Sequence, residues 1–304
     1  MNWITIYASV GKLGKNNAAD VKMITALLNV YARQSGEKEL TISAKSSTAL
    51  EEAITHFQSC HLALVKPDGR VDPNGGTFKG LKQCLKDSFS AKPILAPTVG
   101  KVTWDSEGGE GGRYHSRRLH VPSTSSGLTL GRGYDFRRKT VKKATEDLTA
   151  AGCKKIDLLK KAVGLFGTTA KQFIVDNDLL DYEISSDEQV KLFNISYKDE
   201  EAAVKRICTK KDVEKLYGEC DWDKLDSTIK QVAVDLKFRG DYTGSTRKFV
   251  QKPIADNDFD AFKKVLVDES NWSKVPKDRF RRRKEFINKA SSETSTVVTK
   301  DGAK

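Results

Sequence analysis

The sequence predicts a mainly helical, α+β protein in two parts. Apolar residues recur at helical spacing through most of the chain, while one glycine-rich stretch, residues 126–135, has the pattern of a short hairpin. A segment containing Pro93 and Pro97 separates residues 1–92 from residues 102–290. We expect residues 93–101 to be an extended linker, because proline disfavours helix in itself and in the residue before it. Residues 291–304 are polar and are predicted to be a flexible tail.

Composition limits the classes of protein to consider. With 304 residues, of which 38% are hydrophobic and 31% charged, the chain is long enough for two globular domains. No run approaches the roughly 18 apolar residues of a membrane span. The N-terminus lacks the basic and apolar regions of a signal peptide, so we expect synthesis in the cytoplasm without a leader and no membrane partner.

The net charge of +12 fits either a solvated lysine-rich surface or attraction to a polyanion. No nucleic-acid-binding motif accompanies it, so we expect no nucleic-acid partner. The five cysteines are widely spaced and odd in number, which favours free thiols. The four histidines show no metal-ligand spacing, and we predict neither a metal nor a cofactor.

In the N-terminal part, helix-capping residues and apolar stripes predict three helices. The first follows Asn16 and ends at Gly36, the second begins near Ser47, and the third contains Phe78 and Leu81. A run dense in turn residues, 66–77, separates the last two helices.

The segment around residues 104–135 contains the candidate catalytic groups. Glu107 and Glu110 lie in a predicted glycine-rich turn, and the hairpin follows. Thr129 and Asp135 alternate with Gly131 and Gly133 along an extended strand, so both side chains are expected on one side. Two carboxyl groups with a hydroxyl between them suit glycoside hydrolysis, in which one carboxyl protonates the leaving oxygen and the other activates water.

Periodicity predicts further helices after the hairpin, and the apolar run 223–238 is expected to be the central core helix of this part. The predicted helices span residues 140–151, 156–163, 168–175, 187–197, 199–217 and 223–238.

The Glu-Gly pair at Glu107, followed by Ser-Gly-Leu-Thr-Leu-Gly-Arg-Gly-Tyr-Asp at residues 126–135, resembles the catalytic segment of phage-type lysozymes. Pesticin-like toxin domains and the lysozyme domains of type VI secretion effectors are the most similar. Residues 235–287 resemble the closing lobe of the same fold, so the resemblance covers residues 102–290. It implies a small catalytic hairpin with a helical lobe, the catalytic set Glu107, Thr129 and Asp135, and an inverting reaction.

On this hypothesis Glu107 is the general acid, which requires a desolvated carboxyl group. Asp135 activates water, and Thr129 holds that water. Glu110 is the rival acid, and we expect it to be a solvated loop carboxylate. The predicted substrate-binding residues are Tyr114, Arg132, Tyr134 and Phe238.

Residues 10–90 resemble the three-helix peptidoglycan-binding domain of wall hydrolases, above all in Asp-Gly-Arg-Val-Asp-Pro at residues 68–73. The family's glycine-containing turn before its second helix is replaced here by residues 43–48. Asp68, Arg70 and Asp72 are the predicted wall-binding residues. They fit two roles, because they could either close their own loop by hydrogen bonds or contact the wall.

Together the resemblances imply a modular, monomeric muramidase that cleaves the β-1,4 bond between N-acetylmuramic acid and N-acetylglucosamine. Its partner is peptidoglycan in the periplasm or cell wall, reached after release or injection. A phage endolysin and a secreted effector with an immunity protein both fit. The alternatives are an inactive peptidoglycan-binding or structural protein, or a lytic transglycosylase.

Overall fold

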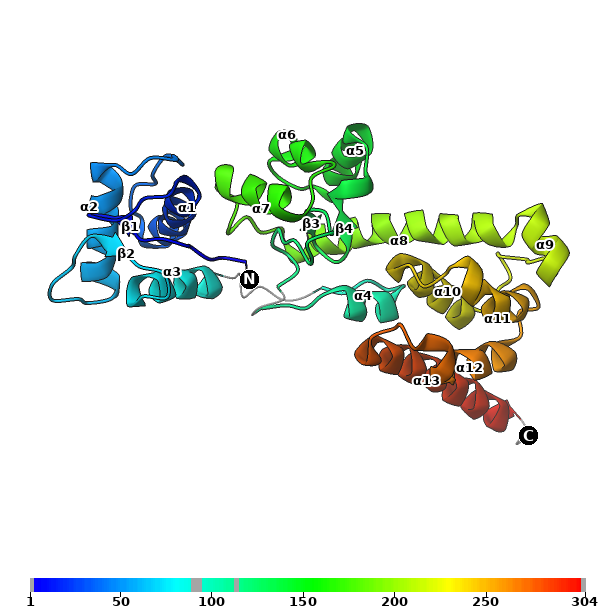
Figure 1. Ribbon diagram of the computed structural model, residues 1–304. Coiled ribbons are helices and arrows are strands. Elements are labelled where there is room, and N and C mark those ends of the chain that lie inside the picture. Colours follow the sequence, from blue (N-terminus) through cyan, green and yellow to red (C-terminus); the bar gives the residue numbers. More distant parts are fainter. Residues whose placement is uncertain (1–2, 89–94, 112–114, 302–304) are drawn as a thin grey trace. The chain divides into compact units, whose positions relative to one another are not determined.

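The structure is a computed structural model that describes residues 3–88, 95–111 and 115–301 (Figure 1). It is mainly helical, with two small pairs of antiparallel strands, in agreement with the predicted fold class. The chain divides into two compact units. Unit 1 comprises Met1–Leu95 and Gly108–Leu192, and unit 2 comprises Ala96–Glu107 and Phe193–Lys304. Within the described ranges, no helix has the length and apolar character needed to cross a bilayer.

The N-terminal part of unit 1 contains the three predicted helices and a two-stranded ladder. Ser47 caps the second helix by accepting a hydrogen bond from the backbone N–H of Leu50. Gly36 ends the first helix with φ of 78°, a conformation that glycine adopts without strain. The elements are β1 (Val10–Gly11), α1 (Ala18–Ser35), α2 (Thr48–His56), β2 (Arg70–Val71) and α3 (Gly76–Asp87), with β1 antiparallel to β2.

The second part of unit 1 is built around the predicted hairpin. Strand β3 (Thr129–Leu130) pairs with β4 (Tyr134–Asp135), and short helices follow. Thr140 caps the first of these helices through the N–H of Lys143. The helices are α5 (Val141–Ala151), α6 (Ile156–Leu159), α7 (Gly167–Asp176) and the beginning of α8 (Ser186–Cys208).

Ion pairs and a hydrogen bond inside unit 1 join residues that precede the predicted linker to residues that follow it. Arg33 of α1 pairs with Asp178 and Asp181, each at 2.8 Å. Buried Arg118 donates to the carbonyl oxygen of Leu85 over 2.8 Å. Pro93 lies outside the described residues. The domain boundaries at residues 92 and 102 therefore stay predictions about which segments fold independently.

Unit 2 packs around α10 (Ser227–Arg239), the predicted core helix. Its Ile229, Val232 and Leu236 are fully buried. Asp226 caps it by accepting hydrogen bonds from the N–H groups of Thr228 and Ile229. The other helices are α4 (Lys101–Glu107), the remainder of α8, α9 (Lys211–Tyr217), α11 (Gly244–Ala255), α12 (Phe259–Val267) and α13 (Lys277–Asp301).

Two predictions about local structure were wrong. The predicted helices 187–197 and 199–217 are divided elsewhere, because α8 continues to Cys208 and the break falls at Thr209 and Lys210. No glycine or proline interrupts the chain near Lys198, so the helix has no reason to end there. Glu107 is the last residue of α4 and does not lie in a turn. Helix α13 extends to Asp301, and the flexible tail expected over residues 291–304 stays a prediction.

Candidate functional site

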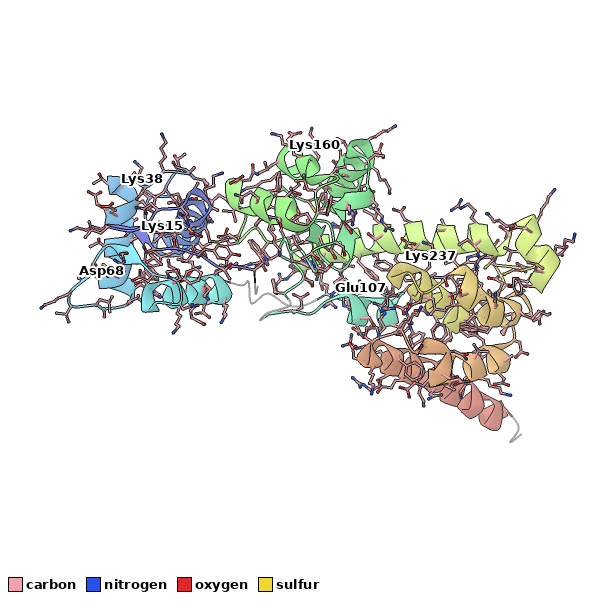
Figure 2. The ribbon with its side chains drawn as sticks, in the orientation of Figure 1. Lys15, Lys38, Asp68, Glu107, Lys160 and Lys237 are labelled. Carbon is pink, nitrogen blue, oxygen red and sulfur yellow. The ribbon has the colours of Figure 1, made fainter. Side chains whose placement is uncertain are left out.

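Glu107 is held by the packing of α4 within unit 2. Trp104, one turn earlier, is 2% exposed and meets the ring of Phe193 edge-on, with centroids 5.1 Å apart. Val102 is also buried. These two buried side chains hold the short helix in place, and Glu107 lies at its C-terminal end (Figure 2). The side chain of Glu107 is 19% exposed. The carboxyl group is therefore mostly removed from water while keeping an opening to solvent.

The carboxylate of Glu107 belongs to a buried group of charges, the Glu107 cluster, which comprises Glu107, Asp235, Arg279 and Arg283. Arg279 of α13 donates to Glu107 through Nη1 and to Asp235 Oδ1 through Nη2, the latter over 2.6 Å. Arg283 donates through Nε to Asp235 Oδ2 over 2.6 Å. Asp235 thus lies between two guanidinium groups, and Arg279 divides its charge between two carboxylates.

These surroundings move the two carboxyl pKa values in opposite directions. Burial raises the pKa of Glu107, and the attraction of Arg279 offsets this only in part. For Asp235, burial acts in the same upward direction, but Arg283 and Arg279 together hold its pKa below the ordinary value. A carboxyl group whose pKa is raised by burial is suited to carry a proton and donate it.

Thr129 and Asp135 are brought together in unit 1 by the hairpin. They are direct cross-strand partners, so their side chains lie on the same face. The expectation that the two residues share one side is therefore confirmed, although they lie on two paired strands and not along a single one. The turn between them passes through Gly131 and Gly133, both with positive φ.

The carboxyl group of Asp135 is positioned by its neighbours. Its Oδ1 accepts a hydrogen bond from the backbone N–H of Arg137 over 2.7 Å. A Cβ atom at Gly127 would lie 2.0 Å from the same oxygen, so only glycine leaves room for this carboxylate. The Thr129 hydroxyl donates to the carbonyl oxygen of Gly127 over 3.3 Å. Gly127 therefore contacts both side chains: it accepts the hydrogen bond of Thr129 and leaves room for the carboxylate of Asp135. Sequence reasoning missed this role.

Glu110 is the centre of a second buried group in unit 1, the Glu110 cluster, which comprises Glu110, His115, Arg117, Arg132 and Gln189. The side chain of Glu110 is only 10% exposed. It accepts hydrogen bonds from Arg117 Nε over 2.9 Å and from Gln189 Nε2 over 2.7 Å, and Arg132 is ion-paired to it at 3.5 Å. The expectation of a solvated loop carboxylate was therefore wrong, because the chain folds back over Glu110.

Two predicted substrate-binding residues are occupied by structural contacts. Arg132 is 6% exposed and donates to the carbonyl oxygen of Gly108 over 2.6 Å, besides its pairing with Glu110. Tyr134 is 1% exposed, and its hydroxyl donates to Asp147 over 3.0 Å. Their assignment to substrate contact stays a prediction, and the structural contacts show a second role for both residues, because sequence alone does not distinguish the inward from the outward positions of a short hairpin.

Phe238 and Tyr114 are the remaining predicted substrate-binding residues. Phe238, in unit 2, is half-buried and stacks on Phe193 with ring centroids 6.0 Å apart. Tyr114 lies outside the described residues.

The three predicted wall-binding residues mainly close their own loop. Asp68 accepts hydrogen bonds from Gln58 Nε2 over 2.6 Å and from the N–H of Arg70 over 3.0 Å. Arg70 donates hydrogen bonds from Nε and Nη2 to the two carboxylate oxygens of Asp72. The first of the two roles considered for these residues is therefore the one seen in their contacts.

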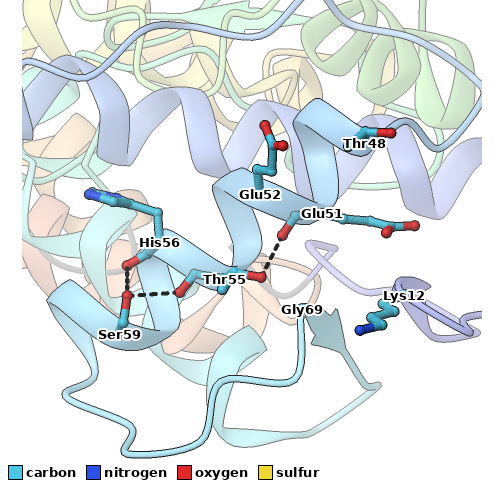
Figure 3. Close-up of a pocket in the computed structure, with 8 residues that line it drawn as sticks. All are labelled: Lys12, Thr48, Glu51, Glu52, Thr55, His56, Ser59 and Gly69. Carbon is cyan, nitrogen blue, oxygen red and sulfur yellow. Dashed lines mark hydrogen bonds between the residues drawn. The ribbon is translucent and has the colours of Figure 1, made fainter.

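A shallow pocket of about 420 Å³ lies beside this loop (Figure 3). The hydroxyl groups of Thr55 and Ser59 are turned toward backbone carbonyl oxygens of α2, those of Glu51 and Thr55 respectively. The lining residues are Lys12, Thr48, Glu51, Glu52, Thr55, His56, Ser59 and Gly69. Asp68, Arg70 and Asp72 do not line it, although Gly69 between them does.

The cysteines are present as free thiols. In the parts of the chain that the structure describes, no group of histidine, cysteine and carboxylate side chains is arranged to hold a metal ion. The Glu107 cluster was missed as a unit by sequence reasoning. A usable signal existed, because Asp235 is the one acidic residue in the helical run 227–239, and Arg279 and Arg283 are four residues apart, the spacing that places two side chains on one face of a helix.

The sequence was compared with known proteins. No protein with a curated description matches it. Residues 100–284, which form more than half of the chain and include α4, the hairpin and the Glu107 cluster, match the model of the family described as "Domain of unknown function (DUF8812)". The protein is therefore a member of this DUF8812 family.

Proposed function

We propose that the protein is a muramidase that hydrolyses the β-1,4 bond between N-acetylmuramic acid and N-acetylglucosamine. The observation that carries the proposal is the state of Glu107, a carboxyl group whose pKa is raised by burial while its orientation is fixed by Arg279. A proton held near neutral pH on a positioned carboxyl group is what general-acid cleavage of a glycosidic bond requires. Peptidoglycan as substrate follows from the resemblance of the catalytic segment to phage-type lysozymes.

Each residue of the proposed set has one role. Glu107 donates its proton to the glycosidic oxygen, and Asp135 accepts a proton from the attacking water. The Thr129 hydroxyl lies beside Asp135 across the hairpin, where it orients that water. In an inverting enzyme the two carboxyl groups must leave room for water, roughly 6.5–9.5 Å in the reacting complex.

Arg279 and Asp235 support this chemistry by setting the orientation and the protonation of Glu107. Arg279 keeps the Glu107 carboxyl group in one orientation, and Asp235 takes up part of the positive charge that would otherwise favour ionised Glu107. Gly127 leaves the space in which the Asp135 carboxylate sits. These residues position the reacting groups and do not themselves transfer protons.

The layout that we propose is a peptidoglycan-binding domain in residues 1–92 and a phage-lysozyme-like domain in residues 102–290. The enzyme acts as a monomer on the cell wall, delivered either as a phage endolysin or as a secreted effector that is countered by an immunity protein. Binding to purified sacculi should survive replacement of Glu107 or Asp135, because neither side chain is part of the proposed wall-binding domain.

The decisive experiment is release of reducing ends from purified peptidoglycan, with mass spectrometry of the products. Hydrolysis leaves reducing N-acetylmuramic acid, whereas a lytic transglycosylase leaves anhydro-muramic ends. Asp135→Asn should reduce the rate by roughly 10²–10⁴-fold, because activation of water fails. Thr129→Ala should be milder, because a second water can replace the hydroxyl. Undiminished turnover by Asp135→Asn, or no turnover by the natural sequence, would contradict the proposed mechanism.

A further inference from the structure

An exposed aromatic ring lies beside the hairpin that carries Asp135. Phe166 is 47% exposed, and its backbone forms an antiparallel bridge with Gly127, the residue beneath the Asp135 carboxylate. Two backbone hydrogen bonds form this bridge, from Leu128 N–H to the carbonyl oxygen of Leu165 over 3.3 Å and from Gly167 N–H to that of Ser126 over 3.0 Å. Hydrogen bonds of the residues on either side of Phe166 thus hold its backbone, while the residue itself stays about half exposed.

Arg137 joins this ring to Asp135. Its backbone N–H donates to the Asp135 carboxylate over 2.7 Å, and its guanidinium carbon lies 4.4 Å from the centre of the Phe166 ring. The guanidinium group also donates to the carbonyl oxygen of Ser125, which restrains it over the ring. Asp135, Arg137 and Phe166 therefore form one local arrangement inside unit 1.

An aromatic ring stacked with arginine presents an apolar surface next to hydrogen-bond donors. A half-exposed phenylalanine ring on a fixed backbone can gain the free energy of burial when a ligand covers it. The C–H face of a pyranose ring is apolar and can stack on phenylalanine, while its hydroxyl and acidic substituents accept hydrogen bonds from a guanidinium group. The arrangement is fixed before the ligand arrives, which lowers the entropic cost of binding.

We infer that Phe166 and Arg137 form a saccharide-binding platform that holds a sugar of the glycan strand next to Asp135. The inference rests on the proposed function and extends it, because it names side chains that bind substrate without taking part in proton transfer. Its ligand is a pyranose of the glycan that carries an acidic or amide substituent, and its effect is on substrate affinity.

The test compares variants of the full chain on soluble, uncrosslinked peptidoglycan fragments. Phe166→Ala should raise KM about tenfold with kcat little changed, because loss of ground-state binding raises KM alone. Phe166→Tyr should restore the KM, since a tyrosine ring has the same stacking face. Arg137→Gln keeps the backbone N–H that positions Asp135, and it should raise KM for fragments with acidic substituents. Val141→Ala, which removes an exposed apolar side chain from α5, is the matched control.

Calorimetric titration of the same fragments into each protein separates the two proposals. If the natural sequence releases reducing ends while Phe166→Ala and Arg137→Gln bind and turn over fragments as it does, the platform is wrong and the muramidase proposal stands. A fall in kcat at constant KM would likewise overturn the platform. If the natural sequence neither cleaves nor binds the fragments, both proposals fail. Weaker binding by Phe166→Ala and normal binding by Phe166→Tyr support the platform.

Discussion

Glu107 and Glu110 are three residues apart, yet the structure places them in different kinds of surroundings. Glu107 lies in unit 2 and shares the guanidinium group of Arg279 with Asp235. Glu110 lies in unit 1, where Arg117, Gln189 and Arg132 all direct donors at its two oxygens. A glutamate carboxyl group thus shares one arginine with another carboxylate in the Glu107 cluster, whereas in the Glu110 cluster it has several donors of its own.

This difference separates a reacting group from a structural one. Several donors directed at one carboxyl group hold it in a single position, which suits a residue that ties a loop to the start of α8. A buried carboxyl group with a divided counter-charge holds its proton more readily, as the raised pKa of Glu107 indicates. The number of nearby arginines is therefore less informative than how their charge is divided.

The largest expected effect is on cleavage by Glu107→Gln. The amide keeps the size of the side chain but has no proton to give, so the rate of reducing-end release should fall by roughly 10²–10⁴-fold. The fold should be retained, since Arg279 stays paired with Asp235. Activity assays at matched circular dichroism would check this. Near-normal turnover would show that the acid lies elsewhere.

The next largest effect is on stability and concerns the centre of the Glu107 cluster. Asp235→Asn removes the fully buried carboxylate between Arg279 and Arg283, which keep only Glu107 and Asp241, respectively, as ion-pair partners. Breaking a buried ion pair on one side typically costs about 3–5 kcal/mol, and we expect a loss of that order in the free energy of unfolding by urea. Asp157→Asn is a matched control, because Asp157 pairs with Lys160 at the surface. Equal midpoints for the two variants would contradict the role given to Asp235.

Glu110→Gln should lower stability and leave activity nearly unchanged, the reverse of what is expected for Glu107→Gln. Arg117 and Gln189 lose one of the two acceptor oxygens that they share, so the free energy of unfolding should fall by about 1–3 kcal/mol. The activity per folded molecule should stay within a few-fold of the natural protein, because Glu110 transfers no proton in the proposed reaction. Denaturation and turnover measured on the same preparations would show this. A stable but inactive Glu110→Gln protein would reverse the assignment of the acid.

The smallest effect is a dependence of stability on pH, with opposite signs for the two members of the Glu107 cluster. The pKa of Glu107 is raised on folding, so this group contributes stability at low pH that is lost as pH rises through its folded value. Asp235 has a lowered pKa and contributes stability near neutrality that is lost in acid. Glu107→Gln should therefore be more stable than the natural protein at pH 7, with the advantage shrinking toward pH 4.

Urea titrations at the two pH values would measure this difference. The control is Glu110→Gln, which should be less stable than the natural protein at pH 7. A Glu107→Gln protein that is also less stable at pH 7 would mean that Arg279 outweighs burial at this carboxyl group.

The sequence alone determined the elements that depend on local interactions. Ser47, Thr140 and Asp226 cap helices where apolar periodicity begins, and Gly131 with Gly133 turns the hairpin. Such signals act over a few residues, so they are visible in the order of residues. The hairpin and the shared side of Thr129 and Asp135 were predicted from the same local signals, whereas their pairing across two strands was seen only in the structure.

Only the tertiary structure decided which charges meet. Arg279 follows Glu107 by 172 residues and Asp235 by 44, so no local pattern relates them. The burial of Glu110, Tyr134 and Arg132 was not visible in the sequence for the same reason, since it depends on what the rest of the chain places over them. Burial and counter-charge set the protonation of a carboxyl group, and both arise from long-range packing. The residue types of the candidate site can be read from the chain, whereas their chemical state is a property of the fold.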